Sequence, residues 1–246
     1  GIKKHDDAYY TQEQHPIIIK NLRKVFPPLS RTAPQKIAVQ SLTMAVEKGE
    51  CFGLLGPNGA GKSTTINMLT GFMTPSAGTA TIIGHDIRSE MPQIHQLMGV
   101  CPQDNLIWDT LTAKEHLLFY GRLKNLKGKA LDSAVEAALR SVNLFNGGVG
   151  DRQTKTYSGG MKRRLSVAIS FMGDPLVVYL DEPSTGLDPA SRQNLWDVVR
   201  RAKAKRGIIL TTHSMQEASA LCDRLGIFVD GQLVCLGNPK QLTTRY

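Results

Sequence analysis

Gly56-Pro57-Asn58-Gly59-Ala60-Gly61-Lys62-Ser63 is the stretch that decides the fold, because it matches every fixed position of the pattern G-x-x-x-x-G-K-[ST]. Residues 50–55 before it are predicted to form a buried strand, and residues 62–70 are predicted to form a helix. A plain surface turn can share the pattern, but the strand before it and the helix after it disfavour that interpretation. The stretch therefore predicts a loop that binds the phosphates of a nucleoside triphosphate.

The chemistry of this loop assigns a role to each of its parts. Its glycines allow the backbone to curl so that N–H groups point at the β- and γ-phosphates, and the helix adds partial positive charge. The Lys62 ammonium reaches the same phosphates, the Ser63 hydroxyl can ligate Mg²⁺, and Thr64 lies toward the α-phosphate. The predicted ATP contacts are Gly56, Pro57, Asn58, Gly59, Ala60, Gly61, Lys62, Ser63 and Thr64.

A second stretch completes the phosphate site. Residues 176–182, Leu-Val-Val-Tyr-Leu-Asp-Glu, are typical of a buried strand that ends in two carboxylates. In α/β sheets ligands bind at the carboxyl ends of the strands, so Asp181 is predicted to hold Mg²⁺ through water. Glu182 is then placed to polarise the attacking water. Such an ending is weak evidence alone and strong evidence together with the upstream loop.

Composition excludes several classes of protein. The chain has 246 residues, of which 41% are hydrophobic, so it can bury a substantial core. It has no apolar run of about 18 residues and no signal peptide, and its four cysteines are expected to be free thiols. The missing initiator Met fits a fragment of a longer polypeptide, or processing. The net charge of +9 fits nucleic acid, an anionic membrane surface, ATP or simply a solvated surface.

Predicted elements alternate between strands and helices along most of the chain, which indicates a mostly parallel sheet with helices on both faces. A block of helices at about 105–165, opened by the capping-box pattern Thr112-Ala113-Lys114-Glu115, is predicted to be an inserted helical subdomain. Hairpins such as the one at Asp230-Gly231 predict an antiparallel accessory sheet. We expect a flexible segment at 1–15 and one α/β domain at 16–246.

A third motif, Tyr157-Ser158-Gly159-Gly160-Met161, resembles the signature of ABC transporters. The resemblance covers about residues 16–242 and implies a P-loop NTPase core with mostly parallel strands, an antiparallel β subdomain and an inserted α-helical subdomain. The form of the motif differs from the commoner Leu-Ser-Gly-Gly-Gln, and it is similar to the A subfamily of eukaryotic ABC transporters. Residues 165–170, 188–192 and 211–215 are similar to those of plant or algal members.

The resemblance implies further site residues. Phe26 would stack on adenine, the alternative being a core aromatic, and residues 27–34 lengthen its usual distance from the loop. Gln103 would contact Mg²⁺ and the attacking water, and His213 would contact the γ-phosphate. Asp188 would reach toward a partner domain. The implied catalytic set is Lys62, Gln103, Glu182 and His213, and the implied metal set is Ser63, Gln103 and Asp181.

The signature motif also has a physical interpretation of its own. Ser158 offers a hydroxyl, Gly159 and Gly160 offer N–H groups, and a helix is predicted to begin near Met161, which makes a second phosphate site. The resemblance implies a head-to-tail dimer in which each signature motif contacts the ATP of the other domain. The partner would be a second ATP-binding domain on the same or a different chain.

These observations predict an ATPase domain of a membrane transporter, on the cytoplasmic face, with ATP and Mg²⁺ as cofactors and a lipid or other hydrophobic substrate. Leu106-Ile107-Trp108 would dock the membrane domains or, alternatively, pack in the core. No specific nucleic acid is expected. One rival is a soluble ABC-type ATPase acting on ribosomes or nucleic acid. The other is a nucleotide-sensing dimerisation module without hydrolysis, which the intact Lys62, Asp181, Glu182 and His213 disfavour.

Overall fold

The computed structural model describes residues 14–28 and 34–245, which form two sheets and the helices around them. The strands are β1 Ile17–Phe26, β2 Lys36–Val46, β3 Cys51–Leu55, β4 Ala77–Ile82, β5 His85–Asp86, β6 Met98–Cys101, β7 Val177–Asp181, β8 Gly207–Thr212, β9 Arg224–Val229 and β10 Gln232–Gly237. The α-helices are α1 Lys62–Leu69, α2 Met91–Leu97, α3 Ala113–Leu123, α4 Gly128–Ser141, α5 Gly159–Ser170, α6 Pro189–Ala202, α7 Met215–Leu221 and α8 Pro239–Arg245. Short 3-10 helices are η2 Asn146–Asp151, η3 Thr154–Thr156 and η4 Lys203–Lys205.

The six-stranded sheet has the order β10-β9-β3-β8-β7-β6, and all its pairs except β9 with β10 are parallel. Because successive side chains of a strand point to opposite faces, the sheet has two cores. Val178 and Leu180 join the core built with α5 and α6, whereas Val177 and Tyr179 join the core on the other face. The mostly parallel α/β fold predicted from the sequence is thus confirmed.

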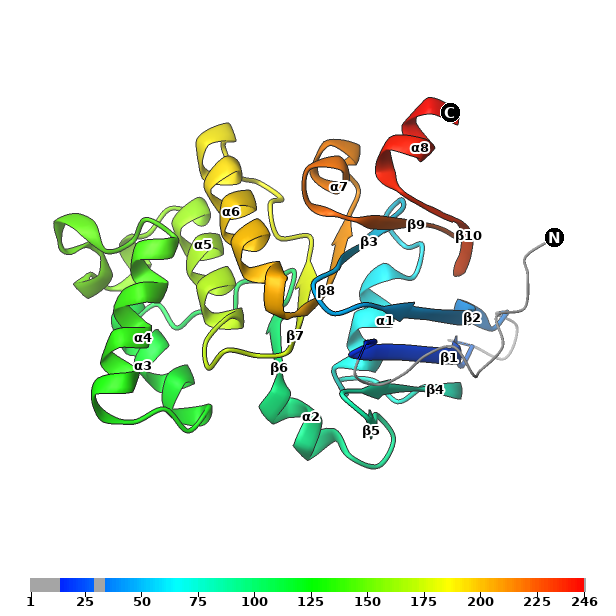
Figure 1. Ribbon diagram of the computed structural model, residues 1–246, viewed down its shortest axis with the longest axis horizontal. Helices are drawn as coiled ribbons and strands as arrows, with labels where there is room; N and C mark the ends of the chain where they lie inside the picture. The colour runs from blue at the N-terminus through cyan, green and yellow to red at the C-terminus, as the bar shows by residue number, and fades with distance from the viewer. Residues whose placement is uncertain (1–13, 29–33, 246) are drawn as a thin grey trace.

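The antiparallel accessory sheet is present, but the strands that form it differ from those expected. It has the order β2-β1-β4-β5 and lies at the end of the molecule opposite α3 and α4 (Figure 1). The hairpin predicted at Asp230-Gly231 forms between β9 and β10, yet it extends the six-stranded sheet. The reason is that β9 pairs in parallel with β3, and Phe228 and Leu225 of β9 are fully buried there.

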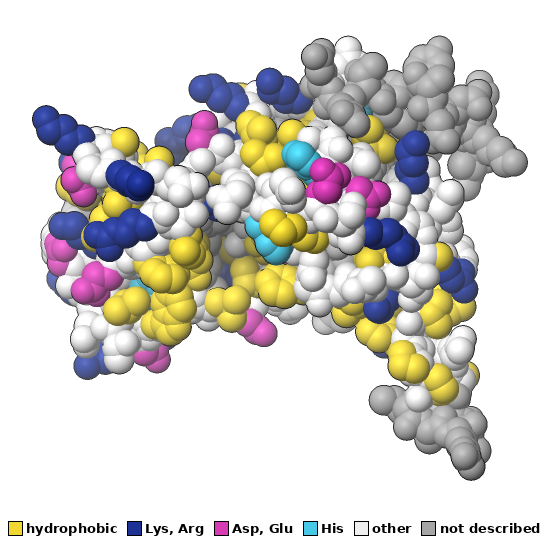
Figure 2. Space-filling view, turned by 90° about the horizontal axis from the view of Figure 1, so that it is seen from below, with side chains coloured by type: hydrophobic (Ala, Val, Ile, Leu, Met, Phe, Trp, Pro, Cys, Tyr) yellow, Lys and Arg dark blue, Asp and Glu magenta, His cyan; other side chains and the backbone are white. Residues whose placement is uncertain are grey.

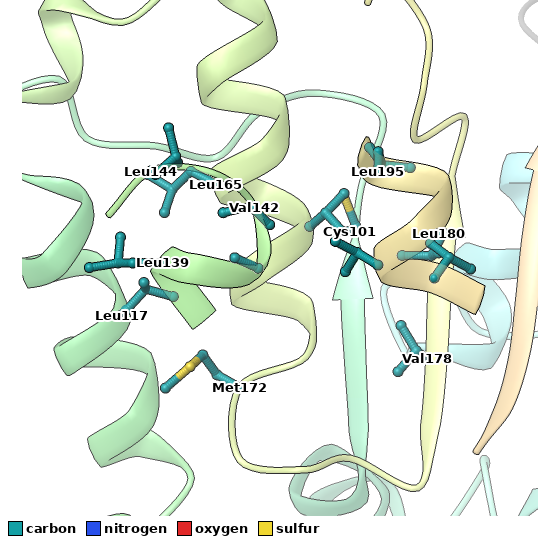
Figure 3. Close-up of a cluster of buried hydrophobic side chains, with 14 of the residues drawn as sticks. Cys101, Leu117, Leu139, Val142, Leu144, Leu165, Met172, Val178, Leu180 and Leu195 are labelled. Atoms are coloured by element: carbon teal, nitrogen blue, oxygen red, sulfur yellow. The ribbon is translucent and has the colours of Figure 1, made fainter. Parts of the chain in front are cut away.

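The predicted helical block is formed by α3, α4, η2, η3 and the start of α5. The capping box is complete, since the Thr112 hydroxyl accepts from the Glu115 amide at 3.1 Å and the Glu115 carboxylate accepts from the Thr112 amide at 2.7 Å. Figure 3 shows side chains of the helical block, among them Leu117 and Leu139, in one cluster with Leu180 of the sheet. A continuous apolar core therefore attaches the helical block to the sheet.

Several boundaries differ from expectation. The strand expected at 17–19 continues to Phe26, and α2 and α8 had no prediction. Residues 1–13 of the expected flexible segment 1–15, and residues 29–33 of the expected loop 27–34, lie outside the described residues. All four cysteines are free, as expected, and only Cys235 is not fully buried. Among the described residues no helix has the length and apolar character needed to cross a membrane.

Candidate nucleotide site

The phosphate-binding loop connects the buried strand β3 to helix α1, as predicted. Gly61 has a φ of 107°, and a Cβ at this position would lie 2.2 Å from the Ala38 carbonyl oxygen, so a larger residue cannot fit. Gly59 has a φ of 82°, and no described atom lies within 4 Å of where its Cβ would be. The loop therefore packs closely against β2 at Gly61, just before α1, and leaves open space for a ligand at Gly59.

Lys62 is the first residue of α1 and is buried, with 4% of its surface exposed. Its ammonium donates hydrogen bonds to the carbonyls of Gly56 at 2.7 Å and Pro57 at 3.0 Å, so its charge lies inside the curve of the loop. It also lies 3.9 Å from a carboxylate oxygen of Glu182. A buried cation needs anionic or dipolar partners, and a phosphate group can supply them.

Asp181 and Ser63 meet at the carboxyl edge of the sheet. The Ser63 hydroxyl donates to the Asp181 carboxylate at 3.2 Å, and the Thr211 hydroxyl at the end of β8 donates to the same carboxylate oxygen. Because β3, β7 and β8 run parallel, their ends lie side by side, with Asp181 paired to Thr211 and Leu55 to Thr212. Two of the three residues predicted as magnesium ligands, Ser63 and Asp181, are therefore neighbours although they are far apart in the sequence.

Glu182 has an unusual backbone and a partnered carboxylate. Its φ is 47°, in the left-handed region that few non-glycine residues adopt. Its amide donates to the carbonyl and the hydroxyl oxygen of Thr211 at 3.1 and 3.0 Å. The carboxylate lies 3.3 Å from His213 Nδ1 and accepts from the Thr185 hydroxyl at 3.3 Å. Glu182 and His213, predicted as catalytic, are therefore in contact.

Lys62, Ser63 and Glu182 line a cavity of about 330 Å³, whereas Asp181 and His213 are not among its lining residues. Its lining residues come from β1 and β2, the phosphate-binding loop, α1 and the segments after β6 and β7: Phe26, Lys36, Ala38, Asn58, Gly59, Gly61, Lys62, Ser63, Thr64, Gln103 and Glu182. Phe26 is half-buried at the end of β1 rather than enclosed in the core. The cavity therefore combines an aromatic ring, a phosphate-binding loop and a carboxylate.

The signature residues lie away from this cavity. Ser158 caps α5 by accepting from the Met161 amide at 3.2 Å, and Gly159 is exposed beside it. The carboxylate of Asp188 lies 3.9 Å from where a Cβ of Gly160 would be. Asp188 is exposed at the start of α6, and hydrogen bonds from Ser191 hold the pKa of its carboxyl below the usual value. The helix N-terminus and Asp188 thus form a second, separate group of predicted site residues.

Comparison with known proteins identifies the family. Residues 39–185 match the family model of the ABC transporter. The chain belongs to the ABC transporter family. It is 64% identical over 230 residues to ABC transporter A family member 8 of Arabidopsis thaliana, and 63% identical over 232 residues to A family member 7 of the same plant. Each match covers 94% of this chain but 25% of the relative, so the chain spans a quarter of the length of these curated relatives.

Solved structures agree with this assignment. An ATP-binding subunit of an ABC transporter superposes with a TM-score of 0.80 at 26% identity, covering 93% of this chain and 92% of that one. A dimeric ATP-binding cassette in a post-hydrolysis state with ADP and Pi has a TM-score of 0.81 at 20% identity, covering 91% and 98% of the two chains, and supports the fold. The chain is thus an ABC transporter ATPase domain that resembles A family members.

Some residues of this ABC domain's site were missed by sequence reasoning. Lys36 and Ala38 line the cavity from β2, and Thr185 and Thr211 hydrogen-bond to the two carboxylates. Thr211 is the next-to-last residue of the strand predicted at 208–212, so its place near the carboxyl edge was a usable signal. Lys36 and Ala38 carried no such signal, because only the pairing of β2 with β1 brings them to the cavity.

Proposed function

We propose that this chain is the ATP-hydrolysing motor of a transporter, closing head-to-tail with a second ATP-binding domain on Mg·ATP. The motor drives transport of a lipid or another hydrophobic molecule as part of a larger membrane protein, on its cytoplasmic face. The observation that carries the proposal is the single cavity lined by Phe26, Lys62, Ser63, Gln103 and Glu182. An aromatic ring suits adenine and a cationic loop suits phosphates, and both line that one cavity.

The residues present fit Mg²⁺. A hydroxyl and a carboxylate, Ser63 and Asp181, lie 3.2 Å apart, and the Gln103 amide lines the same cavity. No cluster of three His, Cys, Asp or Glu side chains suited to a metal occurs among the described residues, and Mg²⁺ needs none, since it binds to one or two carboxylates plus substrate phosphates. When bound, the ion would neutralise charge that develops on the phosphates.

Side chains of this chain supply the remaining roles in hydrolysis. Glu182 accepts a hydrogen bond from the attacking water and orients it, and His213, in contact with that carboxylate, reaches toward the γ-phosphate. Lys62 offsets negative charge on the β- and γ-phosphates. Ser158, Gly159 and Gly160 lie outside the cavity and are available to the ATP of a partner, with Asp188 beside them at the same interface.

Phosphate release is the direct test of the proposed function. We expect the 246-residue chain to release phosphate from ATP when Mg²⁺ is present and to stop when EDTA removes the ion. The measurement is inorganic phosphate over time at saturating ATP. A chain that dimerises on Mg·ATP and still releases no phosphate would instead be a nucleotide-sensing dimerisation module.

Exposed aromatic side chains mark the proposed docking site for the membrane domains. Trp108 packs against Phe119 at 5.4 Å and Tyr120 at 6.2 Å between ring centroids, and we call these three residues the aromatic patch. Trp108 is 47% and Phe119 43% exposed, and Leu106 nearby is 63% exposed. Figure 2 shows hydrophobic side chains gathered over the helical end of the molecule, at the left of the view. Soluble proteins rarely expose a large contiguous apolar patch, and such a patch often marks a site of interaction with a protein or a membrane.

Replacing Trp108 tests whether the aromatic patch is surface or core. Removing a buried Trp costs about 3–5 kcal/mol, so we expect Trp108→Ala to lower the free energy of unfolding by clearly less and to leave phosphate release intact. Urea unfolding and the phosphate assay measure the two effects. The matched control is Ile107→Ala, since Ile107 packs against the core and its loss should cost more. A loss of 3–5 kcal/mol for Trp108→Ala would place it in the core.

A further inference from the structure

The Arg163 side chain donates hydrogen bonds to the backbone that carries the proposed catalytic residues, and the proposed function gives Arg163 no role. It lies in α5, five residues after Ser158, and only 3% of its surface is exposed. Its Nε donates to the Pro183 carbonyl at 2.9 Å, and its two terminal nitrogens donate to the carbonyls of Pro102, Gln103, Asp181 and Glu182 at 2.5–3.0 Å. The five N–H groups of one guanidinium thus meet five backbone carbonyls.

These five carbonyls belong to two separate parts of the site. Two lie in the segment after β6 that carries Gln103, and three lie at the end of β7 and directly after it, at Asp181, Glu182 and Pro183. Arg163 itself belongs to the helix whose N-terminus is the signature motif. Asn105 strengthens the connection, because its side-chain oxygen accepts from Arg163 at 3.4 Å and from Ser166 of α5 at 3.1 Å. One side chain therefore joins three segments that the proposed reaction uses.

The backbone of Glu182 explains why such a connection is needed. A φ of 47° is unfavourable for a residue with a Cβ and persists only where the surroundings hold it. The Glu182 amide donates to the Thr211 oxygens. The carbonyls of Asp181 and Glu182, which flank the φ and ψ bonds of Glu182, both accept hydrogen bonds from Arg163. The two sets of bonds together aim the carboxylate at the cavity.

We propose that Arg163 is a positioning residue that keeps Glu182 and the Gln103 segment in register with the signature helix. It touches neither ATP nor the reacting atoms, and it acts through the carbonyls that it binds. Its loss therefore affects the rate of hydrolysis more than the binding of ATP. This inference rests on the proposed function for its kinetic consequence, but its structural part stands on the hydrogen bonds alone.

The variant that tests the proposal is Arg163→Lys. Lysine keeps the charge but has three N–H donors, so it cannot satisfy five carbonyls, whereas Arg163→Met would leave all five unpaired and risks unfolding. Because small misplacement of a catalytic group costs up to about 10²-fold in rate, we expect kcat to fall about 10- to 100-fold. The KM for ATP should stay within about twofold, since no contact to the nucleotide is removed.

Arg164→Lys is the matched control. Arg164 is the next residue of α5 and donates to the carbonyls of Val142 at 2.7 Å and Asn143 at 3.4 Å, within the helical block. Hydrogen exchange measured by mass spectrometry separates the two variants. We expect Arg163→Lys to speed exchange at residues 102–107 and 181–186, and Arg164→Lys to speed it near residues 142–144 with kcat little changed.

Three outcomes would overturn the proposal: an unchanged kcat in Arg163→Lys, an equal fall of kcat in both variants, or faster exchange spread evenly over the chain. The last would mean that Arg163 serves only overall stability. If the unaltered chain dimerises on Mg·ATP and releases no phosphate, the proposed function fails by itself. The exchange pattern of Arg163→Lys then still decides whether this residue positions the two segments.

Discussion

Glu182→Gln is expected to abolish turnover while leaving ATP bound. The amide keeps the shape of the carboxylate but cannot take a proton from water, and general-base catalysis contributes about 10²- to 10⁴-fold. We therefore expect phosphate release to fall by that factor. ATP affinity should hold, because Lys62 and Ser63, which line the cavity and which we propose to contact the phosphates, are unchanged. With ATP bound and hydrolysis blocked, the closed dimer should accumulate.

Light scattering with and without Mg·ATP measures this accumulation, and an ATP-dependent shift from monomer to dimer is expected. A variant that binds ATP but stays monomeric would show that the proper partner is a different domain, or that membrane segments must hold two domains together. Glu136→Gln is the matched control, because Glu136 pairs with Arg140 on an exposed helix face far from the cavity. Undiminished hydrolysis in Glu182→Gln would remove Glu182 from its proposed role.

Lys62→Ala is expected to have the second large effect, on binding itself. A hydrogen bond to a charged group contributes about 1.5–3 kcal/mol, and about 1.4 kcal/mol corresponds to a tenfold change in affinity. We therefore expect the Kd for ATP to rise about 10- to 100-fold and phosphate release to disappear. The change also removes the hydrogen bonds that Lys62 donates to the carbonyls of Gly56 and Pro57.

Titration with a fluorescent ATP analogue measures this Kd. Lys114→Ala is the matched control, since Lys114 is 55% exposed and forms a surface ion pair with Asp151 at 3.7 Å. Exposed pairs of this kind contribute little, so binding and hydrolysis should be unchanged in the control. Phosphate release that persists in Lys62→Ala would show that the phosphate-binding loop is not the site of hydrolysis.

Short patterns of consecutive residues were enough to predict most of the fold. The phosphate-binding loop lies between a strand and a helix, as its glycines and flanking residues indicated, and the capping box at Thr112 opens α3. The accessory sheet shows the limit of this reasoning. A turn such as Asp230-Gly231 specifies that two strands pair, but which sheet they join depends on β3, far away in the sequence.

The site divides in the same way. The sequence by itself determined the phosphate-binding loop, Asp181, Glu182 and the signature motif, because each is a short run whose spacing carries its chemistry. The tertiary structure alone brought Lys36 to the cavity and Arg163 to the backbone of Asp181 and Glu182, since each arrives from another strand or helix. A motif records what a few consecutive residues can bind. Hydrogen bonds between distant backbones exist only once the sheet has paired and the helices have packed.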